Sequence, residues 1–386
     1  DFLINISYLL ITLLPLFLIT GPFLSDLSII FISLVFVYKS LKEKKFHYYK
    51  SIFFKFFLIF WFYLVVNSLL QYPDLSSLKK TLPYIRFGLY ALSIWYFIDL
   101  DNNILKNLFL SFCLCFLILV IDGYIQFYFG KNLLGYALSE EGRISSFFKD
   151  ELILGSYLSR LFPILFGLLI FLKFDKKFYY GFGLLFVLIE CLTFLSGERS
   201  AFFYINLSAI FMIIMLKGIK LFRFSIWLFS FILIIFISNI SDSTRSRMID
   251  KTIEQTGLSG NESEKYIFSE QHQDHYISAL KMFKQNIFLG VGVRNYRNYC
   301  IDERYYVSEL SCSTHPHNTY LQFLAETGLL GFIFLLTVFL LFFLYCMKDL
   351  YFQIKNKVYF DNFEVCLMSA ILITIWPIVP TGNFFN

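Results

Sequence analysis

Long apolar stretches separated by short charged segments are the main pattern of this chain. Each stretch holds about 20 residues, mostly Phe, Leu and Ile, with few charges. A bilayer core takes about 20 apolar residues per helix, and lipid requires every backbone polar group to be satisfied internally. We therefore predict eleven membrane-spanning helices, at about residues 2–20, 22–38, 52–70, 84–100, 104–122, 151–172, 178–195, 200–216, 224–240, 317–346 and 363–380.

Composition supports this prediction and excludes a soluble globular protein. Of the 386 residues, 58% are hydrophobic and 16% are charged, with a mean hydropathy of +0.65. A soluble domain carries about 25% charged residues. The predicted fold class is an all-α polytopic membrane protein. Because the chain starts at Asp1 and stops with "TGNFFN" just after a span, we expect a fragment, with a twelfth helix if the C-terminus is truncated.

The distribution of Lys and Arg predicts the orientation. One set of short loops carries 15 of these residues and the opposite set carries 6, so the first set is cytoplasmic and the N-terminus is inside. The net charge of +5 mostly reflects this bias and gives no support to nucleic-acid binding. Three regions follow: helices one to nine in 1–240, an external loop domain in 241–316, and C-terminal helices in 317–386.

The external segment 241–316 is polar and long, which is typical of a functional loop. Apolar residues at helical spacing predict an amphipathic helix at 275–288, followed by a turn at "GVGVRNY". Cys300 and Cys312 are the two cysteines of this segment. In an oxidising periplasm they are expected to form a disulfide that tethers the approach to His315 and His317, and the alternative is two free thiols.

Charged side chains inside spans cost several kcal/mol unless they are paired or hydrated. Arg160 lies about nine residues into the sixth span and Glu190 lies in the seventh. Either they form an ion pair, or Arg160 acts together with the other arginines near the outer face. Four outer arginines predict an anionic ligand, because Arg binds phosphate through a bidentate fork; they are Arg86, Arg143, Arg160 and Arg199. For Arg86 alone, contact with lipid headgroups is preferred.

The histidines allow three interpretations. With Asp274, the group of His272, His275, His315 and His317 would be a metal site, although the spacing fits this poorly. A packed or capping histidine is the second interpretation. The third is a general base, because imidazole accepts a proton near neutral pH. We expect His317 at or near the first turn of the tenth span, and a more mobile His315 before Pro316. Asn318 would hold a substrate hydroxyl or orient the ring.

At this point the sequence resembles a known family. "HPHNTYLQFLAETGLLG" is similar to the hallmark of the O-antigen ligase and polymerase superfamily, in which His-Asn is followed by nine residues and G-x-x-G. "NIFLGVGVRNY" resembles the family's P-x-x-G-x-G segment, with Asn286-Ile287 where Pro is usual. "RISSFFKDELILGSYLSRLFP" and "SGERSAF" resemble two further segments, and the resemblance covers about residues 80–385.

The resemblance implies an inverting, metal-independent glycosyltransferase of GT-C-like fold without a cofactor. Its donor would be a glycan on undecaprenyl diphosphate, and its acceptor would be lipid A core oligosaccharide at the periplasmic face of a bacterial inner membrane. It implies that His317 is the base. The residues expected to bind substrate are Arg143, Arg160, Arg199, Arg245, Arg247, Asn318 and Glu326.

One departure and two alternatives accompany this resemblance. Many members carry an Arg where this loop reads "QHQDHY", so His272, His275 or Arg245 would have to take its place. A polymerase uses the same motif with a glycan acceptor, and one sequence does not reveal which acceptor applies. A solute transporter would also use Arg160 and Glu190, but paired, broken helices in matching halves are not evident.

Overall fold

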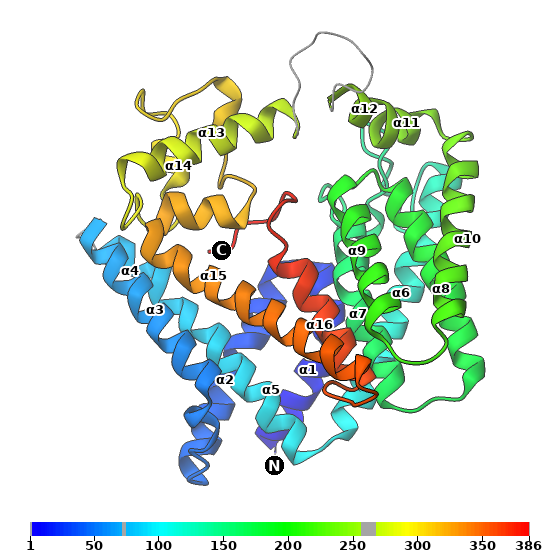
Figure 1. The fold of residues 1–386 in the computed structure, drawn as a ribbon, viewed down its shortest axis with the longest axis horizontal. Coiled ribbons are helices and arrows are strands. Elements are labelled where there is room, and N and C mark those ends of the chain that lie inside the picture. Colours follow the sequence, from blue (N-terminus) through cyan, green and yellow to red (C-terminus); the bar gives the residue numbers. More distant parts are fainter. Residues whose placement is uncertain (1, 72–74, 256–267, 386) are drawn as a thin grey trace.

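The computed structural model describes residues 2–71, 75–255 and 268–385, and in these ranges it contains helices and no β-strand (Figure 1). The helices are α1 Phe2–Thr20, α2 Pro22–Lys42, α3 Ile52–Gln71, α4 Leu75–Thr81, α5 Ile85–Leu100, α6 Asn103–Phe129, α7 Leu154–Phe171, α8 Lys176–Leu195, α9 Arg199–Met215, α10 Lys220–Ser238, α11 Asp242–Arg245, α12 Lys251–Gln255, α13 Glu270–Gln285, α14 Tyr296–Tyr299, α15 Thr319–Ile354 and α16 Asn362–Ile375.

Each of the eleven predicted spans coincides with a helix. Among the described residues, eight of these helices are long and apolar enough to cross a membrane. α5, α9 and α16 are shorter, with 16, 17 and 14 residues. The protein is therefore an all-α polytopic membrane protein, as predicted.

The helix α7 lies at the centre of the helical body. It packs against α6, α8, α9 and α16, and its own side chains are largely buried. α1 packs on α2 and α6, and α10 packs on α8 toward the periphery (Figure 1). Because α7 and α9 begin at the end of the molecule where α11 to α14 lie, their first residues face the segment that contains the predicted site (Figure 1).

The helix α15 is broken near its start. Gly328 has φ 63° and ψ −166°, so a short segment from Thr319 and a long segment to Ile354 meet there at a kink. The prediction of one span at about 317–346 therefore missed this break, and it ended eight residues before Ile354. The chain of residues 287–292 crosses the kink, and four backbone amides bond across it: Val291 to Ala325, Gly292 to Glu326, Leu329 to Ile287 and Leu330 to Phe288.

Two glycines make this crossing possible. A Cβ on Gly290 would lie 2.6 Å from the carbonyl oxygen of Ala325, and one on Gly328 would lie 2.4 Å from that of Phe288. Both residues also have a positive φ, which favours glycine. The glycines of the two sequence motifs therefore allow two backbones to touch, and this contact fixes residues 287–292 on α15.

The predicted eleventh span at 363–380 also ends too late. α16 ends at Ile375, and the following chain turns back toward the start of α15. Asn318 donates to the carbonyl oxygen of Pro377 (2.7 Å), and Tyr320 donates to that of Ile375 (2.6 Å). Pro377 and Pro380 have no amide hydrogen to continue a helix, so the chain lies against residues 315–322 instead.

Candidate active site

Four histidines from two segments gather where α13 meets the start of α15. The ring of His317 stacks on that of His275 (centroids 5.2 Å apart) and meets His272 edge-on at 5.3 Å. His315 is tilted against it at 4.1 Å. α13 brings two of these rings to the site because its amphipathic face, including His275, packs on α15. The helix begins five residues before the predicted start, with Ser269 as its N-cap.

His317 differs from His275 and His315 in exposure, and from all three neighbouring histidines in backbone conformation. His275 and His315 are buried, whereas His317 and His272 are half-buried. His317 has φ 55°, which is uncommon for a residue with a side chain and is typical of functional positions. Its carbonyl oxygen accepts a hydrogen bond from the backbone amide of Thr381 (2.8 Å), and its Nε2 lies 3.0 Å from the Ser313 hydroxyl.

One expectation about these residues is confirmed and one needs correction. His317 lies near the first turn of α15, directly before the N-cap residue Asn318. His315 is held in place, because its Nδ1 lies 2.9 Å from the Thr314 hydroxyl and its Nε2 lies 3.1 Å from the carbonyl oxygen of Thr381. The two residues therefore differ in accessibility: His315 is occupied by internal partners, and His317 faces the open side.

Burial and mutual repulsion decide which ring can take a proton. Burial, together with the charge on His317, lowers the pKa of His272, His275 and His315 to about 4. Burial alone lowers the pKa of His317, by a smaller amount. At neutral pH the rings of His272, His275 and His315 are therefore neutral. Once the His317 ring is charged, it disfavours a second proton on its neighbours.

The described residues contain no group of three or more His, Cys, Asp or Glu side chains that could hold a metal ion. The four rings pack face to face and edge to face, and His315 already uses both nitrogens. This arrangement favours the general-base interpretation over the metal-site interpretation. Metal independence itself stays a prediction.

Three of the predicted arginines form a second group around the turn at Gly197, between α8 and α9. Arg143 donates through Nε to the carbonyl oxygen of Ser196 (3.1 Å), and Arg247 donates through Nε to that of Gly197 (2.8 Å). Arg199 begins α9 and donates to the Thr252 hydroxyl (3.3 Å). All three are half-buried, and the turn Gly197 has φ 70°, where a Cβ would meet Arg247 at 2.9 Å.

Positive charge exceeds negative charge in this group. Burial and the charge of Arg247 lower the pKa of Arg143. Arg247 forms an ion pair with Glu141 at 2.5 Å, and that carboxylate is exposed. The charge of Arg199 also lowers the pKa of His272, so the arginine group and the histidine group lie within electrostatic reach of each other. Arg245 is more peripheral, because it is exposed and pairs with Asp250 at 3.9 Å.

The proposed ion pair between Arg160 and Glu190 is wrong. Arg160 lies over the ring of Tyr204 at 4.7 Å, and Glu190 accepts from the Ser230 hydroxyl at 2.5 Å. No ion pair joins the two in the part of the chain that the structure describes. Arg160 is therefore on the side of α7 that faces α9, while Glu190 faces α10.

Asn318 and Glu326 are engaged within the protein. Asn318 caps α15 by accepting the amide of Leu321 (3.1 Å). Glu326 is fully buried and accepts the amide of Tyr296 (3.1 Å) and the side-chain amide of Gln322 (3.1 Å). Both residues hold the chain around His317 in position, and in this arrangement neither reaches an open surface.

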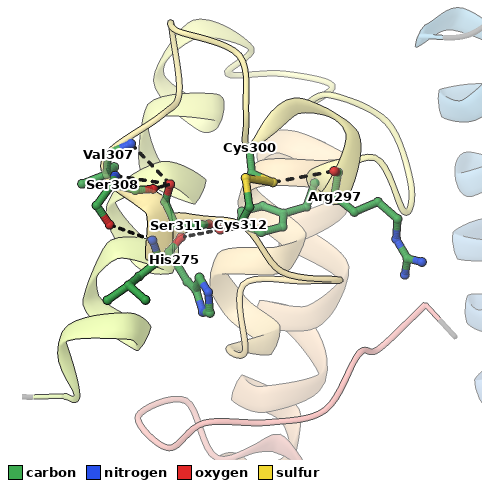
Figure 2. The surroundings of a disulfide bond; sticks show 9 residues. His275, Arg297, Cys300, Val307, Ser308, Ser311 and Cys312 are labelled. Carbon is green, nitrogen blue, oxygen red and sulfur yellow. Dashed lines mark hydrogen bonds between the residues drawn. A yellow bond between two sulfur atoms is a disulfide. The ribbon is translucent and has the colours of Figure 1, made fainter.

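A disulfide joins Cys300 and Cys312 (Figure 2). Their Cα atoms lie 5.2 Å apart, inside the range that a disulfide needs. Tyr296 lies beside it and donates to the carbonyl oxygens of Ser311 (2.7 Å) and His275 (3.3 Å). The bond therefore ties α14 to the strand-like stretch that leads to His317.

Sequence reasoning missed the role of Glu198. Its carboxylate accepts the amides of Gly155 (2.6 Å) and Ser156 (3.0 Å) and the Ser156 hydroxyl (2.7 Å), so it caps α7. Burial raises the pKa of Glu198, although these donors act in the opposite direction. A carboxylate directly before Arg199 would normally pair with it, and the sequence contains no sign that it binds a distant helix end instead.

It also missed the residues that position Arg143. Asp122 accepts from the amide of Leu133 (2.8 Å) and the Ser146 hydroxyl (2.5 Å), and Gln126 accepts the amides of Ser145 and Ser146. Both side chains are buried in α6. The sequence does contain one indication of this role. Asp122 and Gln126 are polar residues four positions apart at the end of an apolar span, and such residues rarely lie in a span without a partner.

Comparison with known proteins agrees with the geometry. Residues 183–336 match the family described as O-Antigen ligase, and this range contains Arg199, α13 and His317. No curated protein matches the chain. Over this range the chain is therefore similar to the O-antigen ligase family, and its apolar helices make it a membrane protein.

Proposed function

We propose that this protein transfers a glycan from undecaprenyl diphosphate to lipid A core oligosaccharide at the periplasmic face of the inner membrane. The observation that carries the proposal is the half-buried His317 in a cluster of histidine rings, together with three arginines around the turn at Gly197. Of these arginines, Arg199 lowers the pKa of His272, whose ring lies 5.3 Å from that of His317. A displacement at a sugar carbon needs a base on one side and stabilisation of the departing charge on the other.

In the proposed step the acceptor hydroxyl attacks the anomeric carbon of the donor. His317 takes the hydroxyl proton as the new glycosidic bond forms. The bond from the anomeric carbon to the diphosphate oxygen breaks at the same time, and its electron pair leaves with undecaprenyl diphosphate. Attack from the face opposite the leaving group inverts the anomeric centre. The Ser313 hydroxyl, 3.0 Å from Nε2, marks a position from which a sugar hydroxyl would reach the base.

Arg143, Arg199 and Arg247 would hold the diphosphate. They converge from three separate segments on one turn, and guanidinium groups match phosphate oxygens in a bidentate way. The additional negative charge of the leaving diphosphate is stabilised by groups already in place, so little reorganisation is needed. Arg160 lies over Tyr204 in α9 and would contact a more distant part of the donor.

Reconstitution in proteoliposomes tests this function. We expect the purified protein to join a lipid-linked glycan to lipid A core oligosaccharide, and to keep this activity in the presence of EDTA. Transfer to a second lipid-linked glycan, with no transfer to the core, would instead support a polymerase. If glycan passes the membrane without forming a new bond, the transferase proposal is wrong.

A further inference from the structure

An exposed apolar patch lies where the crossing segment 287–292 meets the kink of α15. Ile287 is 47% exposed and Phe288 is 66% exposed, although both belong to a stretch that was predicted to be polar and external. Their carbonyl oxygens accept the backbone amides of Leu329 (2.7 Å) and Leu330 (3.3 Å), which are exposed as well. These four residues, the apolar patch, therefore belong to two segments in backbone contact.

The crossing segment bonds to two helices that are long and apolar enough to cross a membrane, α3 and α15, which lie side by side (Figure 1). Asn67 of α3 is buried and donates to the carbonyl oxygen of Leu289 (2.7 Å). Because α3 ends at Gln71, Leu289 bonds to α3 about one turn, or about 6 Å, inside that end. The crossing segment therefore enters the helical body instead of lying beyond its end.

The backbone of the crossing segment is suited to lipid. Lipid offers no partner to backbone polar groups, so an irregular segment enters it only where these groups are bonded within the protein. Three carbonyl oxygens in a row, those of residues 287–289, accept hydrogen bonds from α15 and α3. The next three amides, those of residues 290–292, donate to the carbonyl oxygens of Asn286, Ala325 and Glu326.

The apolar patch is continuous with helix surfaces that face lipid. Ile333, one turn after Leu329 on α15, is exposed, and so is Leu70 near the end of α3. A helix that crosses a bilayer presents such side chains to the acyl chains. Lys284, an exposed residue in the last turn of α13, lies just before the patch. A cation next to exposed apolar residues is typical of the boundary between headgroups and acyl chains.

We propose that Ile287 and Phe288 insert into the acyl-chain region of the membrane. The crossing segment is then a membrane-inserted part of the stretch 241–316. Its continuity with the exposed sides of α3 and α15 favours lipid over a second copy of the chain as the occupant. The inference goes beyond the proposed function, because contact with lipid requires neither donor nor acceptor.

This contact limits the depth of the candidate active site. The first part of α15 rises about 13 Å from Thr319 to Gly328, where the crossing segment touches it. His317 lies two residues before Thr319, so the base is at most about 20 Å from the inserted residues. A substrate whose lipid tail stays in the bilayer could therefore reach it.

Photo-cross-linking in nanodiscs of mass-labelled phosphatidylcholine tests the inference without any substrate. Photoreactive benzoylphenylalanine is placed at position 288, and at position 287 as a second probe. Position 333 on α15 is the positive control. Position 301 is the matched negative control, because Ile301 is 71% exposed and lies in the same stretch, next to the disulfide. We expect lipid adducts at 287 and 288 as abundant as at 333, and only background at 301.

Three results would overturn the inference. The first is no lipid adduct at 287 or 288 while position 333 forms one. The second is equal adducts at 301 and 288, which would place the whole stretch on the membrane surface instead of inserting the patch. The third is a cross-link between two copies of the chain in place of a lipid adduct. Because no result depends on glycan transfer, the inference and the proposed function can fail independently.

Discussion

At the residue scale, the structure distinguishes side chains that the sequence alone could only treat as one group. Only the metal-site interpretation grouped the four histidines, and in the structure their exposure and hydrogen bonds distinguish them. His315 and His275 are buried, His272 and His317 are half-buried, and the pKa of His317 is lowered least. The choice of His317 as the base therefore rests on local burial, which depends on α13 and on the C-terminal segment and is not visible in the motif.

The first prediction concerns Arg199. Replacing it by Lys keeps one positive charge but loses the bidentate contact to phosphate. We expect Arg199→Lys to reduce transfer nearly as much as Arg199→Ala, by at least about tenfold. Initial rates at matched expression measure this, with Arg304→Lys as the control. Full activity of Arg199→Lys would show that Arg199 is not a phosphate ligand.

The second prediction concerns pH. The pKa of His272, His275 and His315 is lowered from the usual 6.5 to about 4, so the unfolded chain binds protons at higher pH than the folded one. Stability of the external segment is then fully present above pH 6.5 and is lost as the pH falls toward 4. Hydrogen exchange in α13, followed at decreasing pH, should show this loss. Unchanged protection at pH 4.5 would contradict it.

At the element scale, the G-x-G and G-x-x-G motifs have one explanation. Gly290 and Gly328 let residues 287–292 cross the kink of α15 at backbone contact distance. The sequence identified these glycines by resemblance, but it could not indicate that the two motifs touch each other. Such a contact joins residues far apart in the chain, whereas hydrophobic periodicity reports on one helix at a time.

The third prediction tests this crossing. A methyl group on Gly290 would lie 2.6 Å from a backbone oxygen, and φ is +66° there. We expect Gly290→Ala to lower stability by about 1–3 kcal/mol and to reduce transfer by more than tenfold. Gly181→Ala is the control, because nothing lies within 4 Å of its added methyl group. Thermal unfolding and transfer assays provide the readouts, and equal behaviour of the two variants would count against the crossing.

The fourth prediction concerns the disulfide. Cys300 and Cys312 join α14 to the chain before His317, so their bond limits how far that chain can move. We expect replacement of both by Ser to lower transfer severalfold by loosening the position of His317, and to leave membrane insertion unchanged. A double variant with wild-type rates would assign the bond to stability alone, which thermal unfolding would then report.

At the scale of the whole molecule, the apolar pattern was sufficient to predict the fold class and the positions of the helices. The ends of helices were less predictable. α16 stops at Ile375 because the following chain bonds to Asn318 and Tyr320, and no local pattern encodes that partner. The arginines around Gly197 were likewise predicted, as individual substrate-binding residues. The sequence did not predict that Glu198 caps α7.

The central claim is that His317 is the base and that the arginines alone hold the donor. The most direct measurement compares His317→Ala with His315→Ala, with donor binding and transfer assayed on the same preparations. We predict that His317→Ala lowers transfer by about 10²- to 10⁴-fold while still binding the lipid-linked donor, and that His315→Ala keeps a substantial fraction of the activity. Near-wild-type transfer by His317→Ala at matched expression, or complete loss in His315→Ala alone, would contradict the account.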